Sequence, residues 1–336
     1  MRGAGPGEDL RALLFYYIDE RIFIIAKPFL TYEQQLHTLS VNKKLIINDK
    51  ASASQALHDI GYFSLIGGYK SPFINPMSRI YENNASFDDI LALYNFDKEL
   101  RHLFFKYICE VESVIRQLTS YAFCNVHGEQ QSAYLSLSSY RVTPKNKYQV
   151  NKLINILDYQ ANKNTEHNYL VHQRNTYKNV PLWVVMNTLT FGQLSHFYSY
   201  LPYQIQSDIN KEFPNVNEHN LERYLDAITL FRNACAHNER LYCFRLASRD
   251  FPDSFLHKKL GISQKGCQYL QGKKDLFGLV IALRHLLPKK SFLQFKKELT
   301  RLINSYQRKS FALKQERLLS FMGFPSNWAN ITRYRI

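Results

Sequence analysis

The chain has 336 residues, of which 45% are hydrophobic and 14% aromatic, so it can bury a sizeable core and is not expected to be disordered. Its formal net charge of +15 at pH 7 favours a polyanionic partner, and nucleic acid is the commonest polyanion. The five cysteines are widely spaced and include no CxxC pair, which argues against a disulfide framework or a zinc site and favours a reducing, cytoplasmic compartment.

The first 26 residues contain two apolar pieces, LLFYYI and IFIIA, which Asp19, Glu20 and Arg21 separate. Neither piece approaches the ~20 apolar residues that a membrane span requires. The opening MRGAGPGED also lacks the cationic start of a secretion signal. We therefore expect no membrane association, and we treat residues 1–26 as a leader whose order the sequence leaves open.

Residues 27–85 predict an N-terminal helical and aromatic segment. One helix is expected over TYEQQLHTLSVNKKL and a second from Ser52 to Ile60. The segment IGYFSLIGGYKSPF at 60–73 is aromatic and is interrupted by a Gly-Gly pair and a proline. A packed turn or a short extended piece is predicted there rather than a helix.

The strongest periodic segment begins after Ser86, which forms a capping signal with Asp89. Apolar residues then recur at intervals of three and four from Ile90 to Leu118. This pattern predicts one long amphipathic helix, or two nearly collinear helices, ending near Cys124.

More helices are predicted in the rest of a helical core at 86–245 and in a basic C-terminal region at 246–336. No β-alternation of useful length occurs, so the predicted fold class is all-α. Thr190 and Gln193 form a capping box at the start of one of these helices. The remaining predicted helices cover 148–162, 181–189, 194–201, 218–241, 274–287 and 291–308.

The string RNACAHNERLY, which begins at Arg232, carries the candidate active site. On a continuous helix Asn233, His237 and Arg240 would fall within about 60° of one another, with Arg232 flanking them. Histidine carries protons near neutral pH, and arginine can hold a phosphate through two hydrogen bonds. Such a set could cut RNA without a metal ion, because the nucleophile is the substrate's own 2′-hydroxyl.

A structural alternative is also open for this string. The two arginines could pair with Glu222, Asp226 or Glu239 while His237 caps a turn, and short R-x4-H strings are common by chance. His167 and His172 lie close together in the sequence, but no carboxylate or cysteine joins them at ligand spacing, so no metal site is predicted.

The string resembles the R-x4–6-H signature of HEPN ribonucleases, and its surroundings resemble the AbiD/AbiF-type abortive infection family of bacteria. The similar pieces are KPFLTYEQQL, IGYFSLIGGYKSPF, DKELRHLFFKYICEVESVIR, NVPLWVVMNTLTFGQLSHFYSYL and the catalytic string, in the expected order. Arg232 and His237 match the catalytic arginine and histidine, and Asn233 matches the polar residue after the arginine. One departure is Ser64, where this family often carries an arginine.

The resemblance implies a HEPN-type helical bundle with additional N- and C-terminal helices, in which two R-x4-H motifs pair across a homodimer. It also implies RNA cleavage without metal or cofactor, leaving a 2′,3′-cyclic phosphate, and a role in phage defence or toxin–antitoxin control. In some members of this family a small non-coding RNA acts as the inhibitor, so RNA is an expected partner as well as the expected substrate.

Two further sets of residues could support such a site. Glu112 and Arg116 share a face of the long helix with Arg101 and Thr119 and could orient His237 or the phosphate, although an ordinary i,i+4 ion pair explains them equally well. The C-terminal basic residues could form an RNA backbone track, with a solvated amphipathic face as the alternative. The predicted RNA-binding residues are Lys289, Lys290, Lys296, Lys297, Arg301, Arg308 and Lys309.

Two functions follow from these features. The first is an endoribonuclease that uses Arg232, Asn233 and His237, with Arg240 in support. The second is a non-catalytic module that holds a structured small RNA, which charge alone would satisfy.

Overall fold

The structure, a computed structural model, describes residues 17–18, 21–22, 28–82 and 84–335. It divides between Phe87 and Asp88 into two compact units, each described here by itself. Helices dominate both, and the described strands form only two-residue pairs, so the predicted all-α class is confirmed. Apart from the pair Tyr17–Ile18 (β1) and Arg21–Ile22 (β2), the predicted leader lies outside the described residues.

The N-terminal unit contains both predicted helices. Helix α1 (Tyr32–His37) begins with a capping box in which Thr31 and Gln34 exchange side-chain and backbone hydrogen bonds. It continues as a π-helical turn at Thr38–Asn42. Helix α2 (Lys50–Ile60) begins at Asp49, whose carboxylate accepts hydrogen bonds from the N–H groups of the first turn.

The aromatic segment after α2 corrects the sequence prediction. It folds as a π-helical turn at Phe63–Gly67 and a 3-10 turn at Ser71–Phe73, not as an extended piece. These turns bury Leu65, Ile66 and Phe73 almost completely, so the burial of apolar side chains outweighs the glycines that predicted a break.

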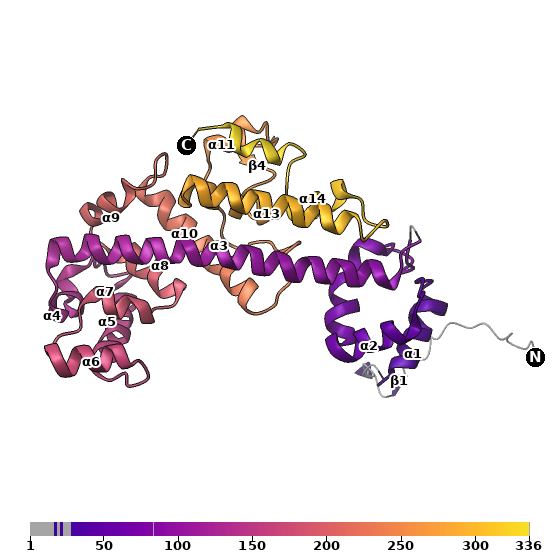
Figure 1. The fold of residues 1–336 in the computed structure, drawn as a ribbon, viewed down its shortest axis with the longest axis horizontal. Helices are drawn as coiled ribbons and strands as arrows, with labels where there is room; N and C mark the ends of the chain where they lie inside the picture. The colour runs from indigo at the N-terminus through magenta and orange to yellow at the C-terminus, as the bar shows by residue number, and fades with distance from the viewer. Residues whose placement is uncertain (1–16, 19–20, 23–27, 83, 336) are drawn as a thin grey trace, which may run out of the picture. The chain divides into compact units, whose positions relative to one another are not determined.

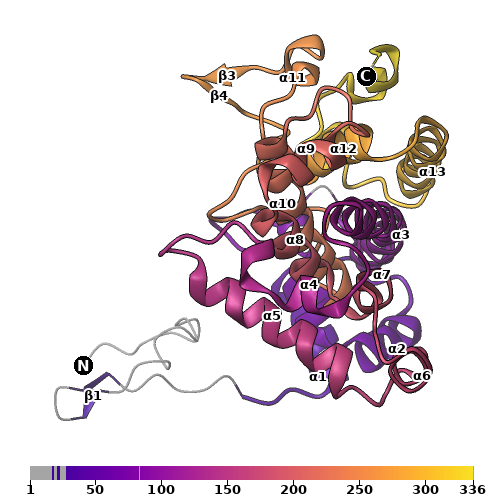
Figure 2. The ribbon, with the colours of Figure 1, turned by 90° about the vertical axis from the view of Figure 1, so that its left-hand side faces the viewer.

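Helix α3 (Phe87–His127) is 41 residues long and carries the predicted apolar stripe. Helix α13 (Lys289–Gln307) lies alongside it in both views (Figures 1 and 2). Phe295 of α13 packs edge-on against Phe104 and Tyr107 of α3, with ring centroids 5.1 and 5.2 Å apart. An ion pair of 3.1 Å between Lys106 Nζ and Glu298 Oε2 joins the same helices at the surface.

Most other helices of the C-terminal unit lie on one side of this pair (Figure 2). Helix α10, which carries the R-x4-H string, packs against α8, and Gly192 allows the close approach because a Cβ there would lie 3.3 Å from Thr229 Cγ2. The predicted capping box of Thr190 and Gln193 is confirmed at the start of α8. The bounds are α4 Gln131–Leu135, α5 Lys147–Asn162, α6 Asn168–Tyr177, α7 Leu182–Val185, α8 Phe191–Tyr200, α9 Tyr203–Asn210, α10 Glu218–Ala236, α11 Phe255–Lys259, α12 Leu276–Leu286 and α14 Gln315–Met322, with 3-10 turns at Leu137–Ser139, Met186–Thr188 and Trp328–Arg333 and a hairpin of β3 Gln264–Lys265 and β4 Gln268–Tyr269.

Five of the observed helices were not predicted, namely α4, α6, α9, α11 and α14. Helix α6 is tied to the end of α5 by Arg174, whose guanidinium donates to the carbonyls of Ala161 at 3.0 Å and Asn164 at 2.5 Å. Among the described helices, none combines the length and the apolar character needed to cross a membrane.

Candidate active site

Helix α10 ends five residues earlier than predicted, and its end shapes the candidate site. The last helical residue is Ala236, and Asn238 adopts a left-handed conformation with φ of 56°. The N–H of Glu239 donates to the carbonyl of Ala234 at 3.0 Å, and that of Asn238 to Cys235 at 3.4 Å. These two bonds form a Schellman motif, which turns the chain away from the helix axis.

This early end corrects the predicted alignment of the string. Asn233 lies on the last helical turn and His237 caps the helix, with its N–H donating to the Asn233 carbonyl at 2.9 Å. Arg240 lies beyond the chain reversal, so it does not share a helical face with them. All three side chains are exposed to solvent at this end of α10.

Arg232 is half-buried and is held by packing. Its guanidinium lies over the ring of Phe105 on α3, with Cζ 5.4 Å from the centroid. Its Nε is buried and has no hydrogen-bond partner among the described residues. In the described part of the chain no ion pair involves Arg232 or His237, and the nearby Asp226 pairs with Arg249 instead. The arginine charge is therefore available to an anion at the surface.

The thiol of Cys109 on α3 is within reach of the charges of Arg232 and of the predicted supporting residues Glu112 and Arg116. Burial raises the pKa of its thiol, the charge of Glu112 raises it further, and the charges of Arg232 and Arg116 oppose that rise. These three charged side chains therefore act on one point of the α3–α10 contact. The thiol itself stays protonated near neutral pH, because the net effect is upward.

Glu112 and Arg116 form the i,i+4 ion pair that the sequence allowed. Arg116 Nη2 lies 2.6 Å from Glu112 Oε1, and it also donates to the carbonyl of Leu189 at 3.1 Å. Leu189 directly precedes the cap of α8, so the pair joins α3 to that helix. Among the described residues no hydrogen bond connects either side chain to His237, and their charges act together with that of Arg232 on Cys109.

A buried network that the sequence reasoning missed holds the segment after the chain reversal. Asp97 on α3 is fully buried, and its carboxylate accepts from Arg101 Nη1 at 2.7 Å, Leu241 N at 3.1 Å and Tyr242 N at 2.7 Å. Arg101 also donates to the carbonyl of Glu239 at 3.3 Å. The only local signal is an aspartate four residues before an arginine within the apolar stripe of α3.

The predicted RNA-binding residues are mostly exposed on and just after α13. Lys296 differs, because it is half-buried and its Nζ donates to Thr332 Oγ1 at 2.8 Å. Burial also lowers the pKa of Lys296. The exposed members are Lys289, Lys290, Lys297, Arg301, Arg308 and Lys309.

Neither a disulfide nor a cluster of metal-ligating side chains occurs among the described residues. All five cysteines are free thiols. Within the described ranges no three His, Cys, Asp or Glu side chains gather in a way that could hold a metal ion. The fold and the site together define an all-α protein that presents an arginine, an asparagine and a histidine at one exposed helix end.

Comparison with known families places this class of protein more closely. The family of Abi-like proteins matches residues 55–243, which is more than half of the chain and includes the whole R-x4-H string. The chain belongs to the Abi-like protein family. This membership indicates abortive infection, a form of phage defence, as its setting. Searches of curated proteins and of solved structures gave no significant match.

Proposed function

We propose that the protein is a metal-independent HEPN endoribonuclease that acts in abortive infection or in a toxin–antitoxin pair. The observation that carries the proposal is the state of Arg232, which is held against Phe105 on the last turns of the helix that His237 caps, with no carboxylate partner among the described residues. An arginine kept in place by an aromatic ring, with its charge uncompensated, is suited to bind a phosphate.

In the proposed reaction the substrate's 2′-oxygen attacks the adjacent phosphorus. The bond between phosphorus and the 5′-oxygen breaks, which leaves a 2′,3′-cyclic phosphate and a 5′-hydroxyl. One proton must leave the 2′-hydroxyl and one must reach the departing 5′-oxygen, and His237 is the proton carrier. Arg232 binds the non-bridging oxygens, on which negative charge grows, and the Asn233 amide donates a further hydrogen bond.

A single histidine serves only one of the two proton transfers at a time. The chain contains one R-x4-H string, so we propose that a second copy of the chain supplies the other histidine in a homodimer. The exposure of His237 at the end of α10 is compatible with a facing partner. We assign supporting roles to Arg240, which follows the chain reversal, and to the Glu112–Arg116 pair on α3.

The test is RNA cleavage by the full chain in excess EDTA, after bound RNA has been stripped away. His237→Ala should lower the rate by at least about 100-fold, the usual contribution of a positioned proton carrier. His219→Ala is the matched control, because His219 is an exposed histidine on the first turn of the same helix. Equal rates for both variants and the wild type would contradict the proposal.

A second candidate function is a non-catalytic module that holds a structured small RNA. The exposed basic residues of α13 and the net charge of +15 favour it. It predicts that wild type and His237→Ala bind RNA equally, with affinity that falls steeply with salt, and that neither cuts it. An inhibitory small RNA bound to α13 would be consistent with both functions.

A further inference from the structure

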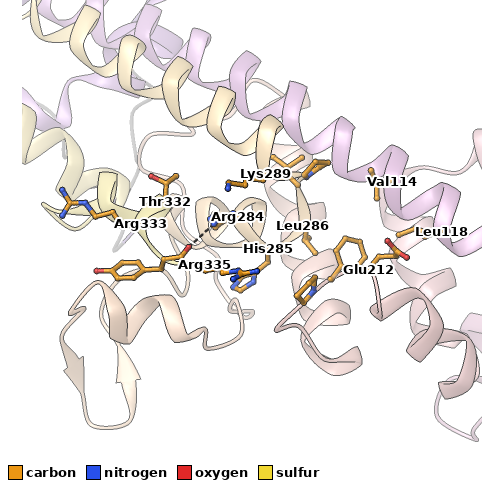
Figure 3. A pocket seen from close by; sticks show the side chains of 15 residues that line it. Val114, Leu118, Glu212, Arg284, His285, Leu286, Lys289, Thr332, Arg333 and Arg335 are labelled. Atoms are coloured by element: carbon orange, nitrogen blue, oxygen red, sulfur yellow. Dashed lines mark hydrogen bonds between the residues drawn. The ribbon is translucent and has the colours of Figure 1, made fainter.

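A groove of about 720 Å³ opens on the C-terminal unit where α12 meets α13 (Figure 3). Its walls come from the α12–α13 junction, from residues 212–214, from the last described residues of the chain and from Val114 and Leu118 of α3. The volume lies within the range of about 300–1,000 Å³ that is usual for small-molecule sites. The groove contains none of the residues proposed to cut RNA.

The groove has a strongly basic rim. Four of its described lining residues, Arg284, Lys289, Arg333 and Arg335, carry positive charge, and Glu212 carries the opposing negative charge. Lys289, Arg333 and Arg335 are exposed, so their charges are accessible to a ligand. Such a balance favours an anionic ligand.

The N-terminus of α13 also lies at this groove. The helix begins at Lys289 after Pro288, and no side chain caps its first turn. The N–H groups of the first turn of a helix have no partner within the helix, and together with the helix dipole they form an anion site.

Two largely buried polar side chains of the groove have incomplete hydrogen bonding. Arg284 and His285, only 9% and 5% exposed, both line the groove. Arg284 Nη2 donates to the carbonyl of Tyr334 at 3.1 Å (Figure 3), but its Nε has no partner among the described residues. The same holds for His285 Nδ1, while its Nε2 lies 2.9 Å from Ser254 Oγ. Buried polar groups are rarely left without a partner.

We propose that this groove binds a nucleoside phosphate, either free or as the terminal nucleotide of an RNA. The phosphates would lie at the N-terminus of α13, against Lys289 and the two arginines near the C-terminus. The apolar wall that includes Phe213, Pro214 and Leu286 would cover the base. A phosphate alone would leave most of this wall uncovered, which is why the ligand is assigned a base as well as a charge.

Calorimetric titration of the full chain with ATP tests the proposal. Lys289→Glu should weaken ATP binding by about tenfold or more, the effect of losing one charge-assisted phosphate contact. Lys152→Glu is the control, since Lys152 is an exposed lysine on α5 that does not line the groove. Arg333→Glu combined with Arg335→Glu should reproduce the Lys289 effect with no change to the buried groups.

Two more probes separate the sources of the ligand. Hexanucleotides protected by 2′-O-methyl groups and carrying either a 5′-triphosphate or a 5′-hydroxyl are titrated in the same way. Preference for the triphosphate RNA over ATP would assign the groove to an RNA end, and equal binding of both would assign it to the free nucleotide. The proposal is overturned if adenosine binds as well as ATP, if neither phosphate-bearing probe binds, or if Lys289→Glu and Lys152→Glu behave alike.

Discussion

Replacing Asp97 by leucine should destabilise the C-terminal unit more than most single substitutions. The change leaves the Arg101 guanidinium, which is 4% exposed, without its buried counter-charge. It also removes the acceptor for the N–H groups of Leu241 and Tyr242. Breaking a buried ion pair from one side costs about 3–5 kcal/mol, so Asp97→Leu should lower the free energy of unfolding by that amount.

The double variant Asp97→Leu/Arg101→Met provides the internal control. It removes both charges, so it should be less destabilised than the sum of the two single variants by about 2 kcal/mol or more. The assay is urea unfolding followed by tryptophan fluorescence, because both tryptophans, Trp183 and Trp328, lie in the C-terminal unit. Amide exchange of Leu241 and Tyr242 should also accelerate in Asp97→Leu.

Two results would refute this reasoning. A loss below about 1 kcal/mol for Asp97→Leu would show that the network contributes no more than an exposed ion pair does. Unchanged amide exchange at Leu241 and Tyr242 would show that Asp97 does not hold the segment after the chain reversal.

Two more predictions concern buried groups of the C-terminal unit. Burial lowers the pKa of His285 from 6.5 to about 4, so as the pH falls the unfolded chain binds a proton at this histidine before the folded chain does. The free energy of unfolding should therefore fall by about 3 kcal/mol between pH 6.5 and pH 4. In urea unfolding measured at several pH values, His285→Asn should reduce this dependence on pH. Equal slopes would contradict the shift. Gly323 has φ of 77°, and a Cβ there would lie 2.3 Å from Asp275 Cγ, so Gly323→Ala should cost about 2–4 kcal/mol. Gly128→Ala, with φ of 80° and nothing within 4 Å, should cost only about 1 kcal/mol, and similar losses of Tm for both would refute the clash.

Short sequence patterns were sufficient to predict two elements of the C-terminal unit. The apolar stripe predicted α3, and the Thr190–Gln193 spacing predicted the start of α8. The end of α10 was predicted too late, although the sequence contains a signal for it. Asn238 is a residue type that favours the left-handed position after a helix. The helical character of the string RNACAHNERL outweighed that signal in the prediction.

The parts that could not be predicted depend on contacts between distant segments. Arg232 gains its place from Phe105, and Asp97 from Leu241, and neither partner can be identified from periodicity. The aromatic segment at 60–73 contains helix-breaking residues, and only the burial of its apolar side chains in the folded unit makes it helical. Tertiary packing overrides local propensity in each case.

The most direct test of the central claim is the chemistry of the RNA ends after cleavage in EDTA. RNA cut by the wild type should carry a 2′,3′-cyclic phosphate and a 5′-hydroxyl by mass spectrometry, and a 2′-deoxy substitution at the cut nucleotide should stop the reaction. His237→Ala should yield neither product, whereas His219→Ala should yield both. Products with a 3′-hydroxyl, or cutting that continues past the 2′-deoxy position, would contradict attack by the 2′-oxygen and with it the proposed role of Arg232 and His237.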